Sequence, residues 1–152
     1  MGDALRYHVN ISAPNLINVC IDDNEMGDMS GRMYCCYCEE AVRFSNIIEL
    51  LRCMERLFDA ISFPQASTKT RMFLDNSEMD ISLNAKPKKI VEQEDVIKYT
   101  GKIGTFITNV QFRQNATWQG EAFWAETGKV LKFSNTLEYI RRLDSAIGSK
   151  EE

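Results

Sequence analysis

Residues 120–141 have the sequence GEAFWAETGKVLKFSNTLEYIR, and residues 31–52 have the sequence GRMYCCYCEEAVRFSNIIELLR. The two stretches align without a gap at a distance of 89 positions. They share the first glycine, the triplet Phe-Ser-Asn, and a glutamate and an arginine near the end. A repeat of this length indicates that one supersecondary unit is used twice, and it therefore decides the fold.

Each stretch passes from the period of a strand to the period of a helix. Val42 and Phe44 share one face of a strand and Arg43 points to the other, a pattern that residues 131–133 repeat. Apolar residues then recur at helical spacing. The first helix is marked by Ile47, Ile48, Leu51, Met54, Leu57, Phe58 and Ile61, and the second by Leu137, Ile140, Leu143 and Ile147.

Both predicted helices have a start signal. An asparagine is followed three residues later by a glutamate, at Asn46 and again at Asn135, which fits a capping box. Ser45 and Ser134 are alternative caps. The recurrence of Ser-Asn therefore has a structural explanation and does not indicate catalysis.

Three strands are expected before each helix. They cover residues 15–21, 32–38 and 41–44 in the first copy; in the second, they cover 105–113, 118–125 and the strand that ends at Phe133. The glycine shared by the copies is expected to form a turn. Alternation along 105–113 places one set of side chains on the buried face, namely Phe106, Val110 and Phe112, and another on the solvent face, namely Asn109, Gln111 and Arg113.

The sequence thus predicts an α+β fold, in which two strand-strand-strand-helix repeats form one antiparallel sheet with helices about a pseudo-twofold axis. Residues 1–63 form the first repeat, 64–104 a connecting segment, and 105–152 the second repeat. Within the connection, 70–74 and 79–83 are candidate short strands, and 92–99 is either a short helix or a linker.

Length and composition bound the class of protein. The chain has 152 residues, of which 44% are hydrophobic and 26% charged, as in an ordinary soluble globular protein. It has no apolar run long enough to span a membrane. Five cysteines without an export signal predict reduced thiols and a cytoplasmic location.

The charge distribution argues against long-range attraction of nucleic acid. The net charge is −4, and residues 1–80 hold 13 acidic and 7 basic residues. Residues 101–152, which contain the second repeat, are near neutral, with 7 basic and 6 acidic residues. No strong basic field is available to steer a nucleic acid to the chain.

No catalytic or cofactor motif is present. His8 is the only histidine, and it stands in the N-terminal segment, which argues against a histidine-dependent nucleophile. The thiols of Cys35, Cys36 and Cys38 suit either a metal or redox site or simple apolar packing, and packing is favoured. On a strand, only Cys36 and Cys38 would share a face. We therefore expect no catalytic residues, no metal and no cofactor.

The segment RQNATWQG, residues 113–120, is the candidate binding surface. Aromatic rings and arginine beside a sheet stack on bases, and amides can bind base edges. The alternative is that both tryptophans brace the core, because aromatic residues dominate burial energetics. The candidate binding residues are Arg113, Gln114, Asn115, Trp118, Trp124, Lys129 and Lys132.

The same segment carries a resemblance. Together with Phe133-Ser-Asn and the helix end LDSAI at residues 143–147, it resembles a group of small uncharacterised proteins of gut Gram-positive bacteria, typically with RQNATWQG, then F-R-S, then LIDSA. The match covers roughly the last 45 residues, and this chain has Ser134 where an arginine often stands. The resemblance implies a bacterial, cytoplasmic protein and carries no activity.

A looser likeness is to PUR-type repeats, which are duplicated sheet-plus-helix units that bind single-stranded nucleic acid. The sequence therefore favours a non-enzymatic binding module that acts through a protein partner or self-association. The alternative is a single-stranded nucleic-acid-binding protein that uses Arg113, Trp118, Trp124, Lys129 and Lys132.

Overall fold

The computed structural model describes residues 13–24, 28–62, 88–114 and 117–150, with the side chains of 114, 149 and 150 left out. Six strands form one antiparallel sheet in the order β3-β2-β1-β4-β5-β6. The strands are β1 (Ile17–Asp23), β2 (Ser30–Cys35), β3 (Val42–Phe44), β4 (Gly104–Gln114), β5 (Thr117–Trp124) and β6 (Lys129–Phe133). The helices of the described part are α2 (Ile47–Ile61), α5 (Gln93–Val96) and α6 (Thr136–Lys150). The predicted α+β class and antiparallel sheet are confirmed.

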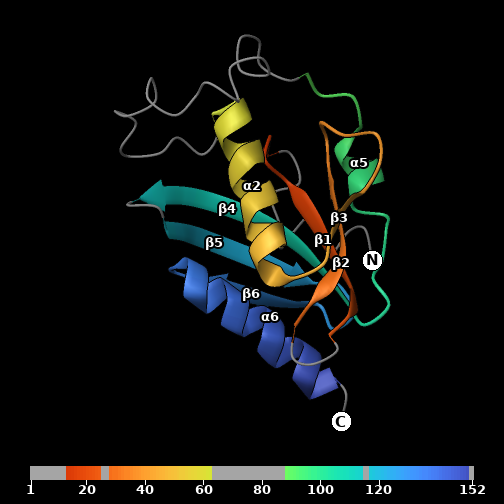
Figure 1. Ribbon diagram of the computed structural model, residues 1–152, viewed down its shortest axis with the longest axis vertical. Helices are drawn as coiled ribbons and strands as arrows, with labels where there is room; N and C mark the ends of the chain where they lie inside the picture. The colour runs from red at the N-terminus through yellow and green to blue at the C-terminus, as the bar shows by residue number, and fades with distance from the viewer. Residues whose placement is uncertain (1–12, 25–27, 63–87, 115–116, 151–152) are drawn as a thin grey trace.

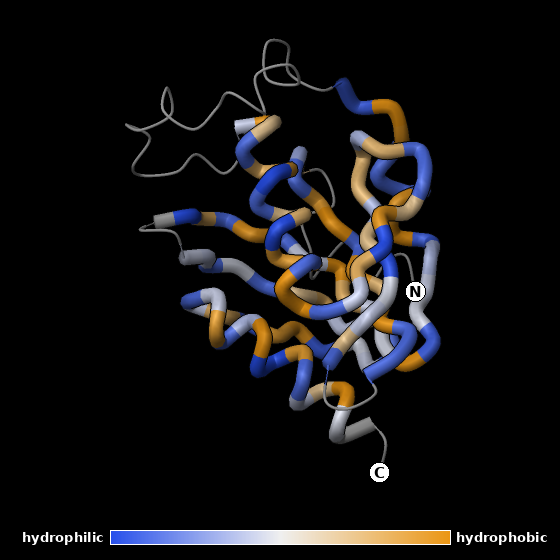
Figure 2. Tube along the Cα trace, in the orientation of Figure 1, coloured by the Kyte–Doolittle hydropathy of each residue, from blue (hydrophilic) through white to orange (hydrophobic). Residues whose placement is uncertain are grey.

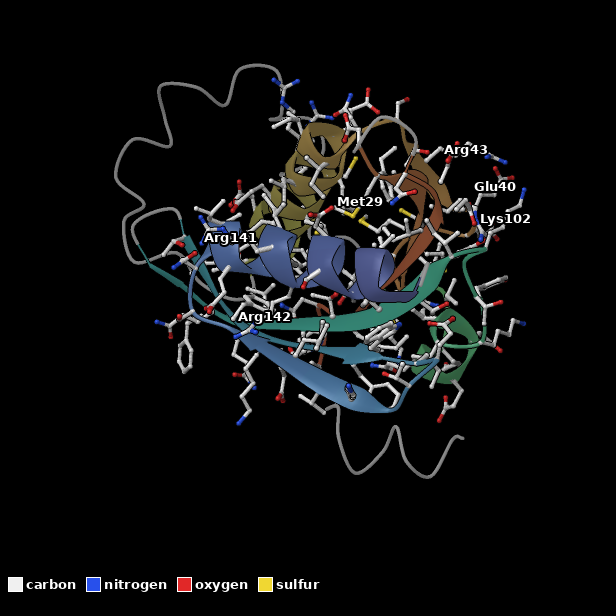
Figure 3. All side chains as sticks on the ribbon, turned by 90° about the horizontal axis from the view of Figure 1, so that it is seen from below. Met29, Glu40, Arg43, Lys102, Arg141 and Arg142 are labelled. Carbon is white, nitrogen blue, oxygen red and sulfur yellow. The ribbon has the colours of Figure 1, made fainter. Side chains whose placement is uncertain are left out.

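The sheet separates two layers of helix. α2 and α6 lie in front of one face (Figure 1), and α5 lies on the opposite side of the sheet (Figure 3). Along α2 and α6, hydrophobic and hydrophilic stretches alternate as in amphipathic helices (Figure 2). The larger core fills the space between the sheet and the two long helices and includes Phe58, Phe106 and Tyr139.

A smaller apolar cluster lies on the other face. It comprises Leu16, Cys36, Val96, Ile107 and Phe123. Polar bonds tie α5 to this face, because the buried Asn18 amide donates to the carbonyl oxygens of Val96 and Tyr99, both at 2.9 Å. The ring of Tyr99 also stacks on Tyr34 with centroids 3.9 Å apart. Of the two alternatives for residues 92–99, a short helix is therefore the one observed.

Asparagine caps both long helices, as the sequence predicts. Asn46 Oδ1 accepts from the backbone N–H of Glu49 at 2.9 Å, and Asn135 Oδ1 accepts from that of Glu138 at 2.8 Å. Each glutamate then reaches back to the backbone N–H of the serine before the cap, at 2.7 Å in both cases. In each capping box the asparagine side chain therefore accepts one bond, and the backbone N–H of the preceding serine donates the reciprocal bond to the glutamate.

The shared glycines lie inside strands, and the prediction of a turn is wrong. A Cβ on Gly31 would lie 2.0 Å from the carbonyl oxygen of Cys20, and one on Gly120 would lie 2.1 Å from that of Asn109. Neither distance is compatible with a side chain. Glycine is needed at both positions because the backbone of the neighbouring strand approaches so closely.

A β-bulge in β4 overturns the predicted faces of its last residues. The pairing of β4 with β5 is regular to Val110 opposite Gly120, skips Gln111, and resumes with Phe112 opposite Gln119. An extra residue in one strand moves every following side chain to the other face. Phe112 is consequently 60% exposed, and Arg113 is buried.

Of the remaining predictions, one is wrong and others fall on residues that the structure does not describe. β2 ends at Cys35 and not at Cys38, because Cys36 and Tyr37 form a turn. The pairing of Cys36 with Cys38 on one strand face is therefore wrong. The candidate strands 70–74 and 79–83 and the histidine at position 8 lie outside the described residues.

Candidate functional site

Within the segment 113–120, the side chains of Arg113 and Trp118 are buried and bind α2. Arg113 Nη1 donates to Glu55 Oε1 at 3.0 Å and to Asp59 Oδ1 at 2.8 Å. The side chain of Arg113 is 5% exposed, whereas the two carboxylates are 39% and 54% exposed. The buried guanidinium thus binds two carboxylates that are partly exposed to solvent. The group of Arg113, Glu55, Asp59 and Trp118 is named the Arg113 clamp.

Trp118 completes the clamp. Its indole N–H donates to Glu55 Oε2, so one carboxylate accepts from both Trp118 and Arg113. The ring is 1% exposed and packs edge-on against Phe58 and Tyr139. An acceptor stabilises a buried indole N–H, and Glu55 supplies one to Trp118. The segment therefore fastens the β4–β5 hairpin to α2.

The other candidate residues do not converge on one surface. Trp124 is 6% exposed and belongs to the core, so the interpretation that both tryptophans brace the core is confirmed. Lys129 and Lys132 are exposed, but they lie on opposite faces of the sheet, because Lys129 pairs with Trp124 and Lys132 with Glu121. Nothing is described of the side chain of Gln114 or of Asn115.

The bulge creates an exposed surface that the sequence pattern does not predict. Phe112 lies on the sheet face opposite α2 and α6, beside its cross-strand neighbour Gln119. Glu121 and Lys132 continue the same face on β5 and β6. Phe112, Gln119, Glu121 and Lys132 are named the outer patch. It combines an exposed aromatic ring, an amide, and one acidic and one basic residue that stand opposite each other on β5 and β6.

A second polar cluster holds the connection to β4. The carboxylate of Asp22 binds Arg32 at 2.8 and 3.0 Å and accepts from the backbone N–H of Lys102 at 3.0 Å. Burial opposes ionisation of Asp22, but these three donors outweigh it and lower its pKa below the ordinary 3.8. Arg32 also donates to the carbonyl oxygen of Thr100 at 2.8 Å. The cluster is a structural anchor.

Neither a metal centre nor a membrane span is found in the described part of the chain. Within those residues, no three His, Cys, Asp or Glu side chains are grouped so that they could hold a metal ion. No helix there is long and apolar enough to cross a bilayer.

Comparison of the chain with protein-family models, with curated proteins and with solved structures gave no significant match.

Sequence reasoning missed the two acids of the clamp and the exposure of Phe112. Glu55 and Asp59 stand four residues apart, which places both on one face of a helix, so this spacing was an available signal. The bulge leaves no comparable mark, because Gln111 is an ordinary strand residue. Without the bulge, the alternation predicts Phe112 inside and Arg113 outside.

Proposed function

We propose that the protein is a non-enzymatic binding module that acts through a protein partner or by self-association, and that the outer patch is its contact surface. The observation that carries the proposal is Phe112, a phenyl ring 60% exposed on a sheet face. Bulges often re-aim side chains at functional sites, and this bulge turns Phe112 outward. Aromatic residues with polar neighbours are typical anchors of protein interfaces.

We also propose that the fold is a tandem strand-strand-strand-helix repeat with a pseudo-twofold axis. The registers support this: Ile17 pairs with Cys35 as Phe106 pairs with Trp124, and the matched residues are 89 positions apart. The bulges also match, because β1 skips Asp22 against β2 as β4 skips Gln111 against β5. At the centre, Ile17 pairs with Thr108 and Val19 with Phe106, an exchange expected across a twofold axis.

Comparison of the two repeats supports Phe112 as a binding residue. Its counterpart 89 positions earlier is Asp23, which is also exposed. Position 112 thus presents an apolar ring where the equivalent position presents a carboxylate. A side chain that the scaffold does not require is a better candidate for binding than one that recurs in both halves.

A second candidate is single-stranded nucleic-acid binding at the same surface. Phe112 stands next to Gln119 on a sheet, an arrangement on which a base can stack, and Lys132 supplies a positive charge nearby. Glu121 on the same face and the net charge of −4 oppose this candidate. Protein binding is therefore preferred.

Phe112→Ser tests both candidates, with Ile48→Ser as the matched control, because Ile48 is 53% exposed on α2. Sedimentation velocity over a concentration series and affinity capture are expected to show an association that Phe112→Ser abolishes and Ile48→Ser retains. A wild type that stays monomeric and captures nothing specific would refute the proposal. Polarisation of a labelled single strand that binds at low salt and weakens as salt rises would favour nucleic acid instead.

We further propose, from the resemblance of residues 113–147, that the protein is bacterial and cytoplasmic. The five thiols, all free in the structure, suit a reducing compartment. Fractionation of cells that produce the full chain tests the location. Recovery in the membrane or secreted fraction would contradict it.

A further inference from the structure

The turn that ends β2 brings two cysteines together. β2 ends at Cys35, and Cys36 and Tyr37 form the turn that leads to Cys38. The first and last Cα atoms of a β-turn lie within about 7 Å, and a disulfide needs a Cα separation of roughly 4.4–6.8 Å. Cys35 belongs to the larger core, and Cys38 packs against that same core. The backbone therefore already holds the pair at a spacing suited to a disulfide.

The two thiols differ in environment. Cys35 is buried in the larger core, and burial raises the pKa of its thiol to about 12, although the backbone N–H of Tyr37 opposes the shift. Cys38 packs at the edge of that core and is only half-buried. A partially exposed cysteine can meet an oxidant from solvent, whereas a buried cysteine is shielded from it. Cys38 is consequently the thiol that a solvent-borne oxidant meets first.

We propose that Cys35 and Cys38 form a redox-sensitive dithiol that hydrogen peroxide converts into a disulfide. The thiolate of Cys38 attacks a peroxide oxygen, so that an S–O bond forms, the O–O bond breaks, and the leaving hydroxide takes a proton to become water. The sulfur of Cys35 then attacks the resulting sulfenic acid, forming the S–S bond and releasing a second water. Two thiols lose two electrons, and the peroxide gains them.

A third cysteine, Cys53, lies near this pair, but it is a less favourable disulfide partner for Cys38. Cys53 on α2 is half-buried, and burial raises its pKa, with a smaller contribution from the charge of Cys38. Cys38 stands at the other end of the same turn as Cys35, whereas Cys53 lies on a separate element, α2. The three thiols are also not grouped as a metal site. The geometry therefore favours a bond between Cys35 and Cys38.

The turn has a structural task that oxidation would affect. The carbonyl oxygen of Cys36 accepts from the backbone N–H groups of Ile90 and Val91 at 2.8 and 3.0 Å. The side chain of Cys36 belongs to the smaller cluster together with Val96 of α5. A disulfide across the turn would fix the point at which residues 90–91 join the sheet. The redox state of the pair thus bears on how firmly α5 is held.

Thiol counting on the folded full chain tests the proposal. The reduced protein is treated with a small excess of hydrogen peroxide, its remaining thiols are alkylated under denaturing conditions, and its peptides are mapped by mass spectrometry. We expect two of the five cysteines to become unreactive, with a linked peptide containing Cys35 and Cys38. Dithiothreitol is expected to restore all five.

Three variants separate this bond from its alternatives. Cys53→Ser is the matched control and should lose the same two thiols. Cys38→Ser should lose none, and Cys35→Ser should leave a sulfenic acid on Cys38 that dimedone traps. A bond between Cys38 and Cys53, no loss of thiols in the wild type, or stoichiometric zinc in the purified protein would each overturn the proposal.

Discussion

Replacing Glu55 with alanine should destabilise the fold more than replacing Asp59, the other acid of the Arg113 clamp. Glu55 accepts from both Trp118 and Arg113, whereas the carboxylate of Asp59 accepts from Arg113. Without Glu55, the indole N–H of a ring that is 1% exposed loses its acceptor, which costs about 1–3 kcal/mol. The lost bond to Arg113 adds about 1 kcal/mol, because Asp59 remains and the carboxylates are near solvent.

We therefore expect Glu55→Ala to lower the free energy of unfolding by about 2–4 kcal/mol and Asp59→Ala by about 1 kcal/mol or less. The assay is urea denaturation followed by tryptophan fluorescence, because the only two tryptophans, Trp118 and Trp124, are both buried. Arg52→Ala, at an exposed position of α2, is the control, with an expected change within about 0.5 kcal/mol. Equal effects of Glu55→Ala and Asp59→Ala would refute the role given to the indole.

Three further predictions concern the caps, a buried hydroxyl pair and acid stability. Asn46→Ala and Asn135→Ala should each lower the free energy of unfolding by about 0.5–2 kcal/mol; a loss for only one helix would contradict the equivalent caps. Tyr139→Phe should cost about 1 kcal/mol, because the Tyr139 hydroxyl lies 3.0 Å from the hydroxyl of Thr108; adding Thr108→Val should recover much of that loss, and calorimetry measures both. The lowered pKa of Asp22 means that its ion pair stabilises the fold above pH 3.8 and that this stability is lost as the pH falls further. Asp22→Asn should therefore flatten the fall in urea midpoint as the pH is lowered below 3.8, and an unchanged fall would show that other groups cause it.

The repeated pattern in the sequence was sufficient for most of the scaffold. Alternation in residues 42–44 and helical spacing in 47–61 predict β3 and α2, and Asn46 marks where the helix begins. These features are local, because each depends on residues within one or two turns of the chain. The confirmed α+β class follows from them.

The candidate site could not be predicted in the same way, because its side chains are placed by long-range events. The bulge at Gln111 exchanges the faces of Phe112 and Arg113, and nothing in the residue itself marks it. Arg113 then binds Glu55 and Asp59, which stand more than 50 positions earlier in the chain. The turn at Cys36 and Tyr37 is local, but it too went unpredicted, and it places Cys35 and Cys38 at its two ends where a longer strand would separate them.

The most direct test of the account is whether the bulge exposes Phe112 and buries Trp118. Hydroxyl-radical footprinting of the folded chain, resolved by mass spectrometry, measures the oxidation rate of each aromatic ring. Phe112 is 60% exposed and Trp118 is 1% exposed, so we predict rapid oxidation of Phe112 and protection of Trp118 until the protein is unfolded. Rapid oxidation of Trp118 with protection of Phe112 would contradict both the Arg113 clamp and the outer patch.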